Sequence, residues 1–246
     1  MVYCSYRIVD VEPMTLLITR VTLTGPDDRT DMARLIDLSQ RFPLVEWALL
    51  YVPHNEGAPR NPTRPWREAF FQQVSSVSAV HLCGALAFEQ LLKGELPVDI
   101  LQAQRLQLNI NARKPDFTEE QVLEVFARAL ELGPDIILQY HPGTAALIER
   151  FAQKVPASDR SRVHVLMDAS RGTGKAPATW VRPAALHELY VGYAGGIGPE
   201  NIESVLRDVS ALGRACWVDM ESGIRTDNQF DAAKAEAVLQ AVEVFA

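Results

Sequence analysis

Glycine-rich turns near the end of the chain are the residues best suited to chemistry. The run AGGIGPEN (194–201) links a short apolar segment to a helical one. Glycines let backbone N–H groups approach an anion closely, and a helix start adds more N–H groups and a favourable dipole. A second turn of this kind follows the next apolar run. Together the two turns predict a phosphate site, although each alone also fits an ordinary connection with a positive φ. The candidate phosphate contacts here are Gly195, Gly196, Gly198, Ser222 and Gly223.

A carboxyl group at the end of another apolar run is the next candidate. Asp168 closes the run RVHVLMD, and the chain continues as ASRGTGKAP. A half-buried carboxyl can have a raised pKa and donate a proton, so Asp168 is a candidate general acid. The alternative is an aspartate that caps a turn. The glycines after Asp168 lack the spacing G-x-x-x-x-G-K-[ST], which argues against a nucleotide P-loop.

Histidines and cysteines are the other reactive side chains. His81 and Cys83 alternate on one apolar run, so they share a face and could form a thiolate–imidazolium pair; two buried strand residues are the favoured alternative. His54 and His141 follow other apolar runs and are interpreted as loop histidines rather than catalysts. Asn109 could bind a sugar hydroxyl or belong to a satisfied polar layer. No metal-ligand spacing such as H-E-x-x-H occurs, so neither a metal nor a cofactor is expected.

Eight short apolar runs, each followed by a helical one, must position these side chains. The runs are rich in Val, Ile, Leu and aromatic residues, which predicts strands. The predicted strands are 16–24, 46–52, 79–84, 105–110, 135–141, 162–168, 188–195 and 215–221. The predicted helices are 31–42, 66–74, 85–93, 119–132, 144–155, 183–188, 199–212 and 231–245. Eight βα units favour an α/β fold, a (β/α)8 TIM barrel, over a doubly wound open sheet, and strand ends form the active-site face of a barrel.

Local signals predict where several helices begin and end. Thr118 and Gln121 have the spacing of a capping box. Pro199 fits the first turn of a helix, and Asp231 can cap the last helix. Gly133, followed by proline, ends the fourth helix.

Composition limits the partners. The chain has 246 residues, 48% of them hydrophobic, and a net charge of −7. This acidic balance argues against nucleic-acid binding, which needs a basic face. No run approaches 18 consecutive apolar residues, so no membrane helix is expected. Three scattered cysteines and the lack of a signal-peptide pattern predict a cytoplasmic protein. We expect one barrel domain over 1–246, with 1–14 as an N-terminal extension, in a monomer or a homodimer.

The motifs together resemble those of the phosphoribosylanthranilate isomerase family, an eight-fold barrel of tryptophan biosynthesis. That family has L-D and G-G-T-G-K with a following tryptophan on strand six, A-G-G-L-x-P-E-N on strand seven, and V-D-x-S-S-G-V-E on strand eight. This chain has LMD, GTGK with Trp180, AGGIGPEN and VDMESGIR in the same order and at similar spacing. The match is good over roughly 160–245. It is weaker but collinear before that, where RLQLN (105–109) is similar to V-Q-L-H-G.

The resemblance implies an Amadori rearrangement of a phosphorylated aminoaldose. A general acid helps the sugar ring to open, and a general base then removes the C2 proton. Asp168 matches the acid, and Asp219 matches a strand-eight residue that faces the substrate. Arg60, in the long loop 53–65, matches the arginine that meets the substrate carboxylate, with Arg64 as an alternative. The phosphate loops are matched by the glycines and serine named above, together with Gly174.

The strand-one base departs from the family pattern. The family has a cysteine there, in K-I-C-G-L-T, whereas this chain has RVTLTG (20–25) with Thr22 in the cysteine's place. A cysteine with a pKa of about 8.5 supplies a thiolate at neutral pH, but an unassisted threonine hydroxyl does not ionise. Asn109 also replaces the histidine of the strand-four motif.

These observations lead to three hypotheses. The first is an aldose–ketose isomerase that acts on a phosphorylated sugar derivative, with Asp168 and Thr22 at the catalytic positions and a substrate that can differ from the family's. The second is a phosphosugar-binding protein whose catalytic pair has decayed. The third is an epimerase on the same barrel. All three predict a small phosphorylated metabolite as the partner.

Overall fold

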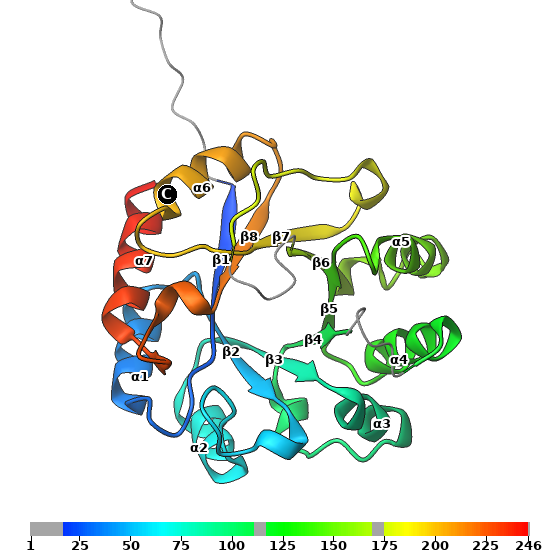
Figure 1. The fold of residues 1–246 in the computed structure, drawn as a ribbon, viewed down its shortest axis with the longest axis horizontal. Coiled ribbons are helices and arrows are strands. Elements are labelled where there is room, and N and C mark those ends of the chain that lie inside the picture. Colours follow the sequence, from blue (N-terminus) through cyan, green and yellow to red (C-terminus); the bar gives the residue numbers. More distant parts are fainter. Residues whose placement is uncertain (1–16, 111–116, 169–174, 246) are drawn as a thin grey trace, which may run out of the picture.

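The strands close into a ring. The computed structural model describes residues 17–110, 117–168 and 175–245. Each strand pairs in parallel with the next, and β8 pairs with β1, so the ring of Figure 1 has no free edge. The strands are β1 (Ile18–Thr24), β2 (Val45–Tyr51), β3 (Val77–Cys83), β4 (Arg105–Asn109), β5 (Asp135–Tyr140), β6 (Val163–Asp168), β7 (Tyr190–Ala194) and β8 (Cys216–Met220). The prediction of a (β/α)8 TIM barrel is confirmed, and the open sheet is excluded.

Helices surround this ring on its outer side, as Figure 1 shows. They are α1 (Met32–Arg41), α2 (Arg64–Gln73), α3 (Ala85–Lys93), α4 (Glu119–Glu131), α5 (Ala145–Lys154), α6 (Ile202–Ser210) and α7 (Ala232–Phe245). Between β6 and β7, the described residues contain only the single 3-10 turn Ala184–Leu186 where a short helix was predicted. In the described ranges no helix is long and apolar enough to cross a membrane. The expected extension, 1–14, lies outside the described residues.

Three of the four predicted signals for helix ends are found at the observed helix ends. Thr118 and Gln121 form the capping box, and Asp231 accepts hydrogen bonds from two N–H groups of the first turn of α7. Gly133 follows the end of α4 with a φ of +108°. The prediction for Pro199 is wrong, because it lies in a turn before α6. Asn201, with a φ of −134°, is not helical and stops α6 from extending back to the proline.

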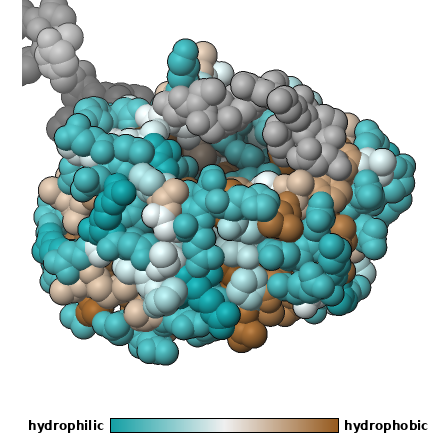
Figure 2. Space-filling model, turned by 60° about the horizontal axis from the view of Figure 1, so that its bottom comes forward, coloured by the Kyte–Doolittle hydropathy of each residue, from teal (hydrophilic) through white to brown (hydrophobic). Residues whose placement is uncertain are grey.

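The main apolar core lies between the outer face of the strands and the inner faces of the helices. Amphipathic helices place one stripe of residues there, such as Leu35 and Leu38 of α1 and Val125 and Phe126 of α4. The outer surface seen in Figure 2 is mainly hydrophilic, with small separate hydrophobic patches. The helices therefore bury one face against the barrel and leave the other to solvent.

The interior of the barrel contains a buried ion cluster, one arginine of which contacts Trp217 of a small apolar cluster with Ile137 and Leu166. The Glu46 carboxylate accepts hydrogen bonds from Arg20, at 2.9 Å, and from Thr22, at 2.9 Å. Arg105 Nε lies 3.4 Å from the same carboxylate, and its guanidinium stacks on the Trp217 ring at 4.4 Å. A buried carboxylate needs such partners, and Arg20, Thr22 and Arg105 supply them to Glu46.

Candidate active site

A pocket opens inside the ring at the carboxyl ends of the strands, the face where TIM barrels place their catalytic groups. Seven strands, all but β2, and three of the loops that follow strands contribute to its wall. The polar residues and glycines that line it are Thr24, Arg60, His81, Gln107, Asn109, Gln139, Asp168, Gly195, Gly196, Asp219, Glu221 and Ser222. The structure therefore brings together residues that the sequence separates by almost 200 positions.

The loops after β7 and β8 meet at one side of this pocket. A Cβ atom on Gly223 would lie 2.0 Å from the carbonyl oxygen of Ile197, and one on Gly198 would lie 3.1 Å from that of Gly223. The two loops therefore touch through their backbones. Gly195 and Gly196 have φ values of +116° and +62°, in the left-handed region that glycine adopts without strain.

Asn201 holds the first of these loops in shape. Its Nδ2 donates to the Gly196 carbonyl at 2.8 Å, and its Oδ1 accepts from the Gly198 N–H at 2.9 Å. The Gly198 N–H is therefore already bonded, and Gly198 and Gly223 lie behind the lining rather than in it. Gly195, Gly196 and Ser222 do line the pocket, whereas Gly174 lies outside the described residues. The position of Asn201 in the motif PEN was the signal that sequence reasoning left unused.

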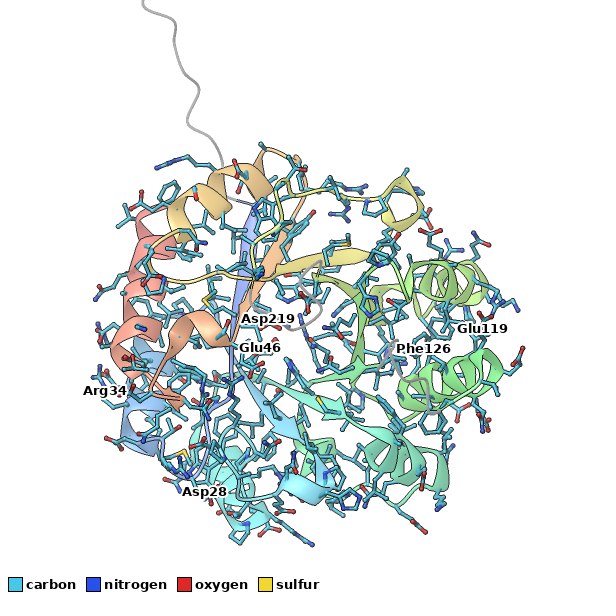
Figure 3. All side chains as sticks on the ribbon, viewed as in Figure 1. Asp28, Arg34, Glu46, Glu119, Phe126 and Asp219 are labelled. Atoms are coloured by element: carbon cyan, nitrogen blue, oxygen red, sulfur yellow. The ribbon has the colours of Figure 1, made fainter. Side chains whose placement is uncertain are left out.

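Two buried carboxylates line the pocket from β6 and β8. Asp168 on β6 pairs in register with Ala194 on β7, which pairs with Asp219 on β8. Asp168 Oδ2 accepts a hydrogen bond from Gln139 Nε2 at 2.7 Å, and Asp219 Oδ1 accepts one from Thr24 Oγ1 at 2.8 Å. Figure 3 shows Asp219 inside the ring of strands. Burial raises the pKa of Asp219 to about 8, against the opposing effect of the Thr24 hydrogen bond.

Thr22, which the sequence predicts at a catalytic position, is not among the residues that line the pocket. Its hydroxyl donates to Glu46 in the buried ion cluster, one layer below, and its side chain is fully buried. Residues two apart on a strand share a face, so the next inward position is Thr24. Strand β1 ends there because Gly25 turns the chain with a φ of +95°. Thr24 thus occupies the strand-one position at the pocket.

Arg60 reaches the pocket from the long loop after β2. Its Nη1 donates to Glu221 Oε1 at 2.7 Å, and its Nε and Nη2 donate to Asn228 Oδ1 at 3.0 and 2.9 Å. The loop is anchored by Asp27, whose Oδ2 accepts from the Arg60 backbone N–H at 2.7 Å. Arg64, the alternative, begins α2, donates to Glu68 and is not among the lining residues.

His81 and Cys83 do not form an ion pair. Burial lowers the pKa of His81 to about 3 and raises that of Cys83 to about 12, so the imidazole and the thiol are both neutral. Cys83 Sγ accepts from Asn109 Nδ2 at 3.1 Å and is not among the lining residues, whereas His81 and Asn109 are. His54 is exposed on a short turn after β2. His141 accepts from the Gly143 N–H and lines a different hollow.

The described residues contain no cluster of three His, Cys, Asp or Glu side chains that could hold a metal ion. What the pocket does offer is a pair of buried carboxylates, a set of amide side chains, one arginine and a wall of glycine backbone. Such a site can transfer protons and hold a polar, anionic molecule.

Comparisons with known proteins agree with this arrangement. The family profile of N-(5'phosphoribosyl)anthranilate (PRA) isomerase matches residues 117–241. The chain is similar in structure to phosphoribosyl anthranilate isomerase from Thermus thermophilus, with 21% identity over 92% of this chain and 100% of that one and a TM-score of 0.54. A phosphoribosyl anthranilate isomerase in complex with reduced 1-(o-carboxyphenylamino)-1-deoxyribulose 5-phosphate is 14% identical over 92% of this chain and 99% of that one, with a TM-score of 0.57.

The same barrel occurs in proteins with other names. A truncated 3-deoxy-D-arabino-heptulosonate 7-phosphate synthase from Thermotoga maritima is 13% identical over 94% of this chain and 87% of that one, with a TM-score of 0.59. At such identities structural likeness shows the fold alone. A search of curated proteins found no match.

Proposed function

The chain belongs to the phosphoribosylanthranilate isomerase family, and from this premise we propose that it isomerises a phosphorylated aminoaldose in the pocket at the strand ends. The single observation that carries the proposal is that one pocket is lined both by the glycine loops after β7 and β8 and by the carboxylates of Asp168 and Asp219. The relative solved with reduced 1-(o-carboxyphenylamino)-1-deoxyribulose 5-phosphate supports a small phosphorylated metabolite as the ligand. No cofactor is needed, because the reaction only moves protons.

The phosphate group would lie against the loops after β7 and β8. Gly195, Gly196 and Ser222 line this side of the pocket, and their backbones can present N–H groups to an anion. The neighbouring Glu221 carboxylate would repel a phosphate, but Arg60 neutralises it through a 2.7 Å ion pair. The same arginine remains close enough to attract an anionic substrate.

Asp168 would act as the general acid. It lies at the end of β6, it is 5% exposed, and Gln139 holds one of its oxygens. From this position it would protonate the ring oxygen of the sugar, so that the ring C–O bond breaks and a C1=N⁺ iminium forms. Asn109 and Gln107 line the wall between β3 and β5 and would bind sugar hydroxyls.

One observation favours a second candidate, a phosphosugar-binding protein without catalysis. Thr24 is the β1 residue that lines the pocket, and no cysteine is among the lining residues of the described pocket. Loss of a positioned base typically lowers a rate by about 10²–10⁴-fold. The described pocket shows no feature that favours the epimerase hypothesis over these two.

The test is turnover of phosphoribosylanthranilate by the purified protein, by Asp168→Asn and by a matched control, Asp208→Asn, which removes a carboxylate from the exposed face of α6. We expect activity in the wild type and the control, and a kcat lower by about 10²–10⁴-fold in Asp168→Asn, because the amide cannot protonate the ring oxygen. An inactive wild type that ribose 5-phosphate nevertheless stabilises against heat would support the binding protein. An inactive wild type without such stabilisation would contradict both candidates.

A further inference from the structure

We infer that Asp219 is the general base that removes the C2 proton, in place of the cysteine that the family uses on strand one. The inference rests on the proposed isomerase function. The side chains of the described pocket wall that can accept a proton are His81, Asp168, Asp219 and Glu221. Asp168 is assigned as the acid, and the Glu221 carboxylate is bound to Arg60. This leaves His81 and Asp219.

His81 is a poor base in this position. The side chain is almost fully buried, and Arg105 lies close enough to add a repulsive positive charge, so both effects oppose formation of the imidazolium. The ring is therefore neutral and holds a proton only weakly. Its Nε2 lies 3.9 Å from Asp219 Oδ2. At this distance the neutral ring can help to orient the Asp219 carboxyl group, but it does not accept a proton readily.

Asp219 has the geometry of a base opposite Asp168. The two residues are in register with Ala194 from either side, and neighbouring strands are about 4.8 Å apart, so the two backbones are separated by about 10 Å. The two carboxyl groups therefore face the same space from β6 and β8. A sugar between them can present its ring oxygen to one carboxyl and its C2 to the other.

Hydrogen bonding fixes the orientation of the Asp219 carboxylate. Thr24 Oγ1 donates to Oδ1 at 2.8 Å, while Oδ2 lies next to His81, another residue of the pocket wall. A base must be held within hydrogen-bond reach of the proton it removes. Thr24 thus acts as a positioning residue for the Asp219 carboxylate on the neighbouring strand β8. This role does not require the threonine hydroxyl to ionise.

The surroundings of Asp219 also suit its basicity. Burial raises its pKa to about 8, and the negative charges of Glu46 on β2 and Glu221 after β8 act in the same direction. Arg105 on β4 and the Thr24 hydrogen bond oppose them, and His81 on β3 is neutral. The ordinary pKa of a cysteine thiol is about 8.5. A buried carboxylate here therefore has nearly the proton affinity of the thiolate that the family uses.

The step balances without any further reactant. Once Asp168 has given its proton to the ring oxygen, the Asp219 carboxylate takes the proton from C2. The electron pair of the C–H bond forms the C1=C2 bond, and the pair of the C1=N⁺ bond returns to nitrogen, giving an enolamine. The enol hydroxyl then returns a proton to Asp168, and C1 receives the proton from Asp219, giving the ketose.

The experiment compares Asp219→Asn, Asp219→Glu and the control Asp208→Asn with the wild type, using phosphoribosylanthranilate with hydrogen or deuterium at C2. We expect Asp219→Asn to lower kcat by about 10²–10⁴-fold, with KM changed by less than about threefold, and Asp219→Glu to restore part of the rate. The isotope effect on kcat should increase in Asp219→Asn. In the wild type, kcat/KM should rise with pH along one ionisation near pH 8, and this rise should be absent from the residual activity of Asp219→Asn.

The outcomes separate the two claims. An inactive wild type refutes the proposed function itself. An active wild type with Asp219→Asn within tenfold of it, or with the same rise near pH 8 in that variant, refutes the role of Asp219 while leaving the isomerase function intact. A rate that falls as pH rises through 8 would likewise overturn the assignment, because it would make Asp219 the acid. If Asp219→Asn does not fold, the wild-type pH profile and Asp219→Glu still decide.

Discussion

Replacing Gly223 with alanine tests whether the two glycine loops form one anion site. The added Cβ would lie 2.0 Å from the Ile197 carbonyl oxygen, whereas real Cβ atoms stay at least 3.0 Å from such an atom. The loops after β7 and β8 must therefore separate by about 1 Å, since backbone rather than a flexible side chain is in the way. Gly223→Ala should therefore weaken ligand binding by moving the backbone of the loops, without contact between the new methyl group and the ligand.

The expected effect on binding follows from hydrogen-bond geometry. An N–H group held about 2.9 Å from a phosphate oxygen would move to about 3.9 Å, which is beyond a hydrogen bond. A hydrogen bond to a charged group contributes about 1.5–3 kcal/mol, so one lost bond corresponds to about 10- to 150-fold in affinity. Overpacking should also lower the free energy of unfolding by about 1–3 kcal/mol.

Calorimetric titration with ribose 5-phosphate measures the binding, and urea denaturation measures the stability. Gly213→Ala is the matched control: its φ of +74° makes alanine unfavourable, but a Cβ there has no neighbour within 4 Å and lies after α6, away from the pocket. The control should lose about 1–2 kcal/mol of stability and no affinity. Equal affinity of Gly223→Ala and wild type, at a temperature where both are folded, would refute the shared anion site.

Two further predictions concern the interior of the barrel. Thr22→Val removes the hydrogen bond to buried Glu46, so it should lower the free energy of unfolding, measured by urea denaturation, by about 1.5–3 kcal/mol. It should leave kcat unchanged, whereas Thr24→Val, which removes the hydrogen bond to Asp219, should lower kcat. The reverse pattern would assign the catalytic position to Thr22. The pKa of Asp219 is about 8 in the folded protein, against 3.8 for an ordinary aspartate in the unfolded chain. The folded state therefore binds more protons between these values, and the free energy of unfolding should fall as pH rises from 6.5 to 8. His81 acts in the opposite sense only below about pH 6.5, where the unfolded chain takes up its proton. Thermal or urea unfolding of Asp219→Asn across pH 6.5–8 should therefore show a smaller decline than the wild type, and parallel curves would contradict the buried, protonated carboxyl.

Much of the candidate site could be predicted because it consists of strand ends. The apolar runs predict the strands, and the glycines predict the turns that follow them. These patterns place Asp168 at the end of one strand and Gly195 and Gly196 after another. A closed parallel barrel brings all such strand ends to one face. The predicted strands agree with the observed ones to within about two residues. The end of the first strand was predicted correctly at Thr24, but the resemblance to the family motif placed the site residue at Thr22, whereas Thr24 is the threonine that lines the pocket.

The sequence by itself determined the number and order of the barrel strands, the capping box of α4 and the loops with glycine at their turns, since each depends on residues close together in the chain. Only the tertiary structure decided which inward-facing residues lie at the mouth and which lie below it. Closure between β8 and β1 puts Thr24 against Asp219, 195 positions away, and leaves Thr22 with Glu46 in the buried layer. The stagger of the strands around the ring sets these heights, and burial at that height is also what raises the pKa of Asp219.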